Sequence, residues 1–317
     1  MSFNIAGTGM YVPEKIVTND DLAKIVDTND EWISKRVGIH QRHISTDETA
    51  AQMGYKAALN ALENAGVDKS ELDMILVATV SGETVSPNTA CMIQHYLGVD
   101  CMAYDINAAC SAFIFLLDTA AGYFARGKAK KILVVGAERM SRIIDWSDRS
   151  TCVIFGDGAG AAVLTEGDGY IDSTFKVQGG DEVINIPQFI GCSPWYTPEQ
   201  VNPYVHMAGQ ETFKFAVNSI THDIPELLER NGLTKEDVDH VVLHQANRRI
   251  IDFAVSRLKM DADKFFVNIE KYGNTSSASI PIALDELNRA GGLKKGDLVV
   301  LSAFGGGLAS ASCLIKW

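Results

Sequence analysis

The feature that most constrains the fold of this chain is an internal repeat. The segment "LENAGVDKSELDMILVATV" begins at Leu62, and its counterpart "LERNGLTKEDVDHVVLHQA" begins at Leu228, at an offset of 166 residues. At the same offset "CSAFIFLLD" from Cys110 matches "SSASIPIAL" from Ser276. Further on "LVVGA" from Leu133 matches "LVVLSA" from Leu298 at an offset of 165. Three blocks in one order indicate two copies of a single structural unit, which the 317 residues are long enough to hold.

Each copy has the hydrophobic pattern of an α/β unit. The segment "AAQMGYKAALNALENAG" has apolar residues at helical spacing and ends at Gly66, and "FIFLLDTAAGYFARG" is apolar on every side, which is typical of a buried helix. The short run "MILVATV" is typical of a strand covered on both faces. We therefore predict an α/β protein built as a five-layered αβαβα sandwich, with an N-terminal half over residues 1–172 and a C-terminal half over residues 173–317.

The composition excludes several classes of function. The formal net charge of −12 argues against nucleic acid as a general partner. The N-terminus lacks a basic segment followed by an apolar one, and no apolar run approaches the roughly 18 residues of a membrane span. The six cysteines are scattered, without a CxxC pair or a metal-ligand spacing. We expect a cytoplasmic protein that binds no metal, no membrane and no nucleic acid.

Three residues that suit nucleophilic catalysis follow predicted strands. Cys110 stands before the buried helix of the first half, Asn274 stands at the matching turn of the second half, and His244 ends the strand "HVVLHQAN". The carboxyl ends of strands in open α/β sheets commonly meet at a ligand site. A helix N-terminus lowers the pKa of a cysteine, a histidine stabilises or transfers charge, and an asparagine amide donates to an oxyanion. The alternative is a structural cysteine, a core histidine and a turn asparagine.

A second candidate site lies in "DTNDEWISKRVGIHQRHI". Thr28 and Glu31 have capping-box spacing, which predicts a helix start, and Trp32 and Arg36 then share one helix face. An indole beside a guanidinium suits an adenine base and its phosphates, although a structural cation–π pair explains the same pattern. The stretch "FGDGAGAAVL" lacks the context of a phosphate loop and is interpreted as close strand packing.

Four motifs in this order, "INAACSAF", "HQANRRI", "YGNTSSAS" and "FGGG", make the whole chain resemble the β-ketoacyl-acyl-carrier-protein synthase III family of the thiolase-like superfamily. The resemblance implies a thiolase-like fold, a homodimer and a catalytic triad of Cys110, His244 and Asn274. It also implies the initiating condensation of type II fatty acid synthesis, in which an acyl-CoA primer acylates Cys110 and malonyl-acyl-carrier protein then loses CO2 and attacks the thioester. No cofactor is expected beyond these substrates.

The resemblance also implies binding residues, each at the position that matches the family motif. The N–H groups of Cys110 and Gly306 hold the thioester oxyanion. The CoA-binding positions match Thr28, Trp32, Arg36, Arg149, Gly209, Phe213 and Asn247. The primer pocket matches Ser86, Met207 and Phe304, with Ser86 closing the pocket of the partner subunit. The acidic carrier protein is expected to dock on a local basic patch formed by Arg249, Lys214 and Arg257.

The chain departs from the family pattern at two places. Where acetyl-preferring members have a bulky phenylalanine, this chain has Ser86, which predicts room for a longer or branched primer unless a shifted backbone closes the pocket. After "FGGGL" many members have Thr-Trp-Gly, while this chain has Ala309-Ser310-Ala311. The second departure bears on local packing and loop mobility, and not on the triad.

Other proteins that use related residues fit this sequence less well. A papain-like protease also uses cysteine, histidine and asparagine, but the internal repeat has no place there. A thiolase needs a second cysteine near the C-terminus, and Cys313 stands in an apparent final strand instead. Hydroxymethylglutaryl-CoA synthases have insertions that are absent at this length. A specialised-metabolite ketosynthase or acyltransferase of the same fold stays as the alternative. The preferred primer, the choice between carrier protein and CoA, and feedback regulation are left open.

Overall fold

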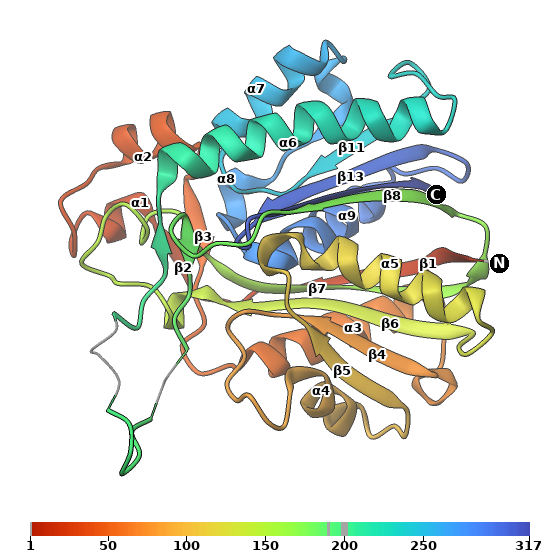
Figure 1. Cartoon of the computed structure of the whole chain (residues 1–317), viewed down its shortest axis with the longest axis horizontal. Coiled ribbons are helices and arrows are strands. Elements are labelled where there is room, and N and C mark those ends of the chain that lie inside the picture. Colours follow the sequence, from red (N-terminus) through yellow and green to blue (C-terminus); the bar gives the residue numbers. More distant parts are fainter. Residues whose placement is uncertain (1, 189–190, 198–201) are drawn as a thin grey trace.

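The computed structural model describes residues 2–188, 191–197 and 202–317. Within these ranges the chain forms two five-stranded sheets (Figure 1). The first sheet has, in spatial order, β1 (Ser2–Tyr11), β7 (Asp157–Gly167), β6 (Lys131–Arg139), β4 (Met74–Ala78) and β5 (Met102–Ile106). The second sheet has β8 (Tyr170–Val177), β14 (Ala309–Lys316), β13 (Leu298–Gly305), β11 (His240–Leu243) and β12 (Phe265–Phe266).

The two sheets have the same topology. In the first, β4 pairs in parallel with β5 and β6, while β7 pairs antiparallel with β6 and β1. In the second, β11 pairs in parallel with β12 and β13, while β14 pairs antiparallel with β13 and β8. The internal repeat of the sequence is therefore a repeat of structure. The chain passes from the first sheet to the second between β7 and β8, and the predicted boundary after residue 172 lies inside β8.

Helices form three layers around and between the sheets. The helices α5 (Ala112–Ala125) and α9 (Ser279–Arg289) lie between them, and their apolar side chains share one core with both sheets (Figure 1). The outer face of the first sheet is covered by α3 (Ala50–Ala65) and α4 (Thr89–Leu97). The outer face of the second sheet is covered by α6 (Gly209–Arg230) and α7 (Arg248–Leu258). This arrangement confirms the predicted five-layered αβαβα sandwich.

Shorter elements connect these layers. They are β2 (Ile16–Thr18), α1 (Asn19–Leu22), α2 (Asp30–Val37), β3 (Gln41–His43), η1 (Lys69–Glu71), η2 (Ala109–Ser111), η3 (Met140–Arg142), β9 (Ile184–Asn185), β10 (His206–Met207), η4 (Ala262–Lys264), α8 (Ile269–Tyr272) and η5 (Ser276–Ala278). None of the helices in the described ranges combines the length and the hydrophobicity that crossing a membrane requires.

Local sequence accounts for the predicted elements. Helix α3 begins at a capping box, in which Thr49 and Gln52 satisfy each other's backbone N–H groups, and it ends at Gly66 in the left-handed conformation. Helix α5 is buried along most of its length, with both Phe113 and Leu117 fully buried, but Asp118, Gly122 and Ala125 form an exposed stripe. Both helices and the strand β4 confirm the interpretation of their hydrophobic patterns.

The alignment of the two halves shifts by one residue near the candidate nucleophile. Ala109 and Ser276 each begin a 3-10 turn, and each has a positive φ, of 48° and 50°. Ala109 is therefore the structural counterpart of Ser276, and Cys110 is the counterpart of Ser277. The sequence alignment of Cys110 with Ser276 is wrong by this one position, because it keeps a constant offset and the two connections before the turns differ in length.

Candidate active site

A cavity of about 770 Å³ lies between the halves, and residues from both halves line it. Most of the predicted site residues are in its wall, namely Cys110, His244, Asn274, Gly306, Trp32, Arg36, Arg149, Gly209, Phe213, Asn247, Met207, Phe304 and Arg249. The predicted residues outside this wall are Thr28, Ser86, Lys214 and Arg257. The structure thus brings the three candidate catalytic residues to one cavity, as expected for strand ends that converge.

Cys110 lies in the η2 turn directly before α5. The preceding Ala109 has a positive φ of 48°, a conformation that side chains rarely adopt and that is often found at functional sites. The Cys110 Sγ lies 3.4 Å from Ser276 Oγ of the other half. A Cβ added to Gly305 would lie 2.8 Å from the Cys110 backbone nitrogen. Only glycine therefore allows the end of β13 to approach the nucleophile so closely.

The surroundings of Cys110 overturn one prediction. Burial raises the pKa of the Cys110 thiol to about 12, with the Ser276 hydroxyl lowering it and Glu138 raising it by smaller amounts. The predicted lowering of the Cys110 pKa is therefore wrong, because the burial of the thiol is the largest effect and it disfavours the thiolate. Cys110 is consequently a neutral thiol near neutral pH.

This pKa predicts how the reactivity of Cys110 depends on pH. Alkylation by iodoacetamide requires the thiolate, so its rate at Cys110 should rise about tenfold per pH unit up to about pH 10 without levelling off. Peptide mass spectrometry after timed alkylation separates Cys110 from the other cysteines, and a free cysteine in the same mixture is the reference. A rate that levels off below about pH 8 would instead indicate a lowered pKa.

His244 follows strand β11 and is almost fully buried. Its Nδ1 lies 2.6 Å from Ser279 Oγ, its backbone N–H donates to the Ser302 carbonyl, and its ring packs edge-on against Phe304 with 5.3 Å between ring centroids. Burial lowers the pKa of His244 to about 3. The imidazole is therefore neutral at physiological pH and has one N–H to donate.

Asn274 is held by its backbone and by its side chain. Its N–H donates to the Ile154 carbonyl, and its own carbonyl accepts from Gly156 N–H. The side-chain Oδ1 accepts from the Ser276 backbone N–H at 2.8 Å. With the oxygen engaged in this way, the Nδ2 amide is left as a donor toward the cavity that Asn274 lines. Asn107 makes the same contact with Ala109 in the other half, at 3.2 Å.

The predicted adenine site lies on helix α2. The guanidinium of Arg36 lies 5.6 Å from the centroid of the Trp32 ring, and that of Arg149 lies 5.3 Å from it. The N-cap of α2 is Asn29, whose side chain accepts from Trp32 N–H, so the predicted cap at Thr28 is wrong. The spacing to Glu31 favoured Thr28, but asparagine is at least as good a cap and has extended backbone angles here.

The predicted docking residues form a basic patch on α6 and α7. Lys214, Arg249 and Arg257 are exposed, and among the described residues none of the three has an ion-pair partner. The Arg249 guanidinium lies 5.8 Å from the Phe213 ring and that of Arg257 lies 5.0 Å from the Phe253 ring. Because Arg249 and Phe213 also line the cavity, the patch continues to the cavity opening.

The apolar part of the cavity includes Phe304 and residues of the short β9–β10 ribbon. Met207 lies in β10 and lines the cavity as predicted, but the sequence analysis missed Ile184 and Ile186. The alternation of apolar residues in "VINIP" is the signal that could have indicated them. Ser86 is exposed in its own chain and lies outside the cavity, so its role in a partner's primer pocket stays a prediction.

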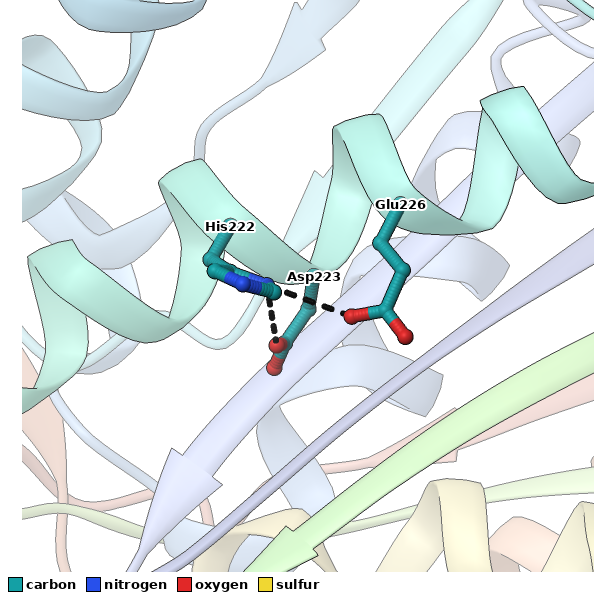
Figure 2. Close-up of side chains that lie close together, drawn as sticks. All are labelled: His222, Asp223 and Glu226. Carbon is teal, nitrogen blue, oxygen red and sulfur yellow. Dashed lines mark ion pairs between the residues drawn. The ribbon is translucent and has the colours of Figure 1, made fainter.

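A cluster of possible metal ligands lies elsewhere, on helix α6. His222, Asp223 and Glu226 point toward one another (Figure 2). The Lys176 ammonium lies within 2.9 Å of all three side chains, and Ser310 Oγ donates to the second oxygen of the buried Asp223. A lysine therefore already supplies the positive charge at the centre of this cluster. Ser310, which replaces the tryptophan of the family pattern, is part of the same network.

Comparison with known proteins shows the family of the chain. The family described as 3-oxoacyl-[acyl-carrier-protein (ACP)] synthase III matches residues 104–179, and its C-terminal part matches residues 228–317. A relative from Clostridium acetobutylicum, named beta-ketoacyl-[acyl-carrier-protein] synthase III, is 46% identical and the alignment covers 100% of this chain and 99% of the relative.

Solved structures give the same result. The 3-oxoacyl-[acyl-carrier-protein] synthase III of Aquifex aeolicus is 43% identical, with a TM-score of 0.92 over 99% of this chain and 100% of that one. The priming β-ketosynthase of the R1128 polyketide pathway is 37% identical, with a TM-score of 0.92 over 99% of this chain and 96% of that one. The family match, the full-length relative and the solved structures show that the chain belongs to the 3-oxoacyl-[acyl-carrier-protein] synthase III family.

Proposed function

We propose that this protein is a cytoplasmic, homodimeric condensing enzyme that initiates type II fatty acid synthesis from an acyl-CoA primer and malonyl-acyl-carrier protein. One observation carries the proposal. Cys110, the neutral His244 and the Asn274 amide line a single cavity, next to an indole–guanidinium pair and a basic patch. This reaction needs a nucleophile, two neutral hydrogen-bond donors, a binding site for CoA and a docking surface for an acidic carrier protein.

The first step transfers the primer to Cys110. The sulfur attacks the thioester carbonyl of acyl-CoA, and the CoA thiol leaves with the proton that Cys110 loses. The oxyanion of the tetrahedral intermediate is stabilised by the backbone N–H groups of Cys110 and Gly306. The tight approach of Gly305 to Cys110 places this glycine turn beside the nucleophile. Ile184, Ile186 and Met207 surround the acyl chain and keep water away from the thioester.

The second step forms the new carbon–carbon bond. The bond from the malonyl Cα to its carboxylate breaks, CO2 leaves, and the electron pair passes to the thioester oxygen as an enolate. The neutral His244 and the Asn274 amide donate hydrogen bonds to that oxygen. The enolate carbon then attacks the acyl group on Cys110, and the thiolate leaves. Donors suit this step better than bases, since negative charge develops on oxygen without any proton being removed.

Binding of CoA is supported by the residues at the cavity mouth. The adenine is expected to insert between the Trp32 ring and the Arg149 guanidinium, which lies 5.3 Å from the centroid of that ring. The phosphates then lie near Arg36, which also packs on Trp32. Gly209, Phe213 and Asn247 line the path from this mouth toward Cys110.

Docking of the carrier protein is expected to depend on Arg249. In an Arg249→Glu variant the rate with low concentrations of malonyl-acyl-carrier protein should fall at least about tenfold, because an attractive charge becomes a repulsive one beside an acidic partner. Lys295→Glu makes the same charge change near the start of β13, at the end of that strand opposite Gly305, and should have little effect. Steady-state kinetics at two salt concentrations measures both. Equal loss in the two variants contradicts a local docking site.

The homodimer is supported by one edge of the first sheet. Strand β5 is the edge strand there, and its Met102 is 51% exposed. An unpaired edge with exposed apolar side chains is usually covered in a stable protein. Residues 84–87 are also exposed. This segment contains the apolar side chain of Val85, which is 76% exposed. A second copy that covers both surfaces would place Ser86 in the partner's primer pocket.

A second candidate function is priming of a specialised-metabolite pathway. The likeness to the R1128 priming ketosynthase favours it, since that similarity is nearly as high as the similarity to the Aquifex enzyme. Intact-mass measurement of Cys110 acylation with straight and branched acyl-CoAs, followed by detection of β-ketoacyl-carrier protein, tests the proposal. Condensation onto the fatty acid carrier protein supports fatty acid initiation. Acylation without condensation on that carrier supports the specialised pathway.

A further inference from the structure

Among the described residues, the hydroxyl of Ser279 is the only side-chain group within hydrogen-bond distance of Nδ1 of His244. Ser279 is the first residue of α9, and its Oγ lies 2.6 Å from His244 Nδ1. Both side chains are almost fully buried, at 2% exposure. The contact joins the start of α9 to the residue that follows β11. It engages Nδ1 and leaves the other ring nitrogen, Nε2, without this partner.

Hydrogen-bond accounting decides which group donates. The backbone N–H of Gln245 points at the same Ser279 oxygen, at 3.4 Å, and an N–H can only donate. Within the described residues, Nδ1 of His244 is then the acceptor that remains for the Ser279 proton. If Nδ1 carried the ring proton instead, the buried hydroxyl proton of Ser279 would have no acceptor, which is unfavourable. Ser279 therefore donates to Nδ1.

We propose that Ser279 is a positioning residue that holds His244 in the tautomer with its single proton on Nε2. The catalytic effect of this tautomer rests on the proposed function. The hydrogen bond between Ser279 and His244 does not depend on that function. A proton on Nε2 makes His244 a hydrogen-bond donor to the enolate oxygen that forms when CO2 leaves. It also means that His244 Nε2 does not take the thiol proton of Cys110, so the two half-reactions should depend differently on Ser279.

The experiment measures the tautomer and both half-reactions. In protein labelled with 15N-histidine, the chemical shifts show which ring nitrogen of His244 is protonated, and a His244→Asn variant assigns the signals. Wild type should show protonated Nε2. Ser279→Ala should lose this preference and show a mixture of tautomers. Malonyl-carrier-protein decarboxylation should fall at least about tenfold, since one donor is misplaced for part of the time. Acylation of Cys110 by acyl-CoA should change less than about twofold, because it does not use this proton.

Two further variants separate positioning from stability. Ser312→Ala removes another buried serine hydroxyl, one that donates to Ser302 at 2.8 Å, and should leave the tautomer unchanged. Ser279→Thr keeps a hydroxyl and should restore most of the decarboxylation rate. A wild-type signal with protonated Nδ1, or an unchanged tautomer in Ser279→Ala, would overturn the proposal. An Nε2–H signal in a protein that shows no condensation would instead leave this assignment in place and contradict the proposed function.

Discussion

Replacing Cys110 by alanine is expected to abolish acylation by acyl-CoA and, with it, condensation. The wild-type protein mixed with a reactive acyl-CoA should gain the mass of one acyl group per chain, and the variant should gain none. The reason is chemical, since no other cysteine lines the described cavity with Cys110. The loss of turnover should be at least about 10³-fold, as is typical when a covalent nucleophile is removed.

The control for this result is a second cysteine. Cys313 is fully buried in β14, and burial raises its pKa above the usual range, so Cys313→Ala should be acylated like wild type. Thermal unfolding of Cys110→Ala checks that the fold is intact. A mass gain that persists in Cys110→Ala, or that disappears in Cys313→Ala, would contradict the assignment of the nucleophile.

Replacing Asn274 by alanine is expected to separate the two half-reactions. Decarboxylation and condensation should fall by about 10²–10³, which is the usual effect of removing one oxyanion donor. Acylation of Cys110 should persist, because the donors for that intermediate are backbone N–H groups. Stopped assays that follow CO2 release and intact mass in parallel measure the two steps separately.

An isosteric variant sharpens this test. Asn274→Asp keeps the oxygen that accepts from Ser276 N–H but replaces the donor Nδ2 with a second acceptor. Decarboxylation should therefore fall as far as in the alanine variant, although the size of the side chain is unchanged. If Asn274→Asp retained decarboxylation, donation by the amide would not be the role of this residue. If acylation were lost as well, Asn274 would act in the first step.

Much of the fold was predictable because its signals are local. The repeat, the helix α3 with its glycine end and the buried strand β4 follow from hydrophobic spacing and turn residues within about 20 positions. The failures were also local choices between near-equal options. The cap of α2 went to Asn29 and not to Thr28, and the alignment of the halves slipped by one at Cys110.

The residues of the candidate site were predictable from the sequence, but their protonation states were not. Sequence motifs named Cys110, His244 and Asn274, and the structure brings all three to one cavity. The direction of the Cys110 pKa was predicted wrongly, because the sequence shows a helix start but not the burial that raises the pKa of the thiol. Lining residues such as Ile184 were missed, because each strand of their ribbon is only two residues long and gives a weak sequence signal.

By itself the sequence determined the element types, the two-fold repeat and the identity of the residues that carry the chemistry. Only the tertiary structure decided their electrostatic state: a neutral thiol at Cys110, a neutral imidazole at His244 and an amide held with its donor free at Asn274. The physical reason is that the groups that surround these side chains come from several segments of the chain: Ser276 lies 166 residues from Cys110, and Ser279 lies 35 residues from His244. Such neighbours exist only once these segments have packed together.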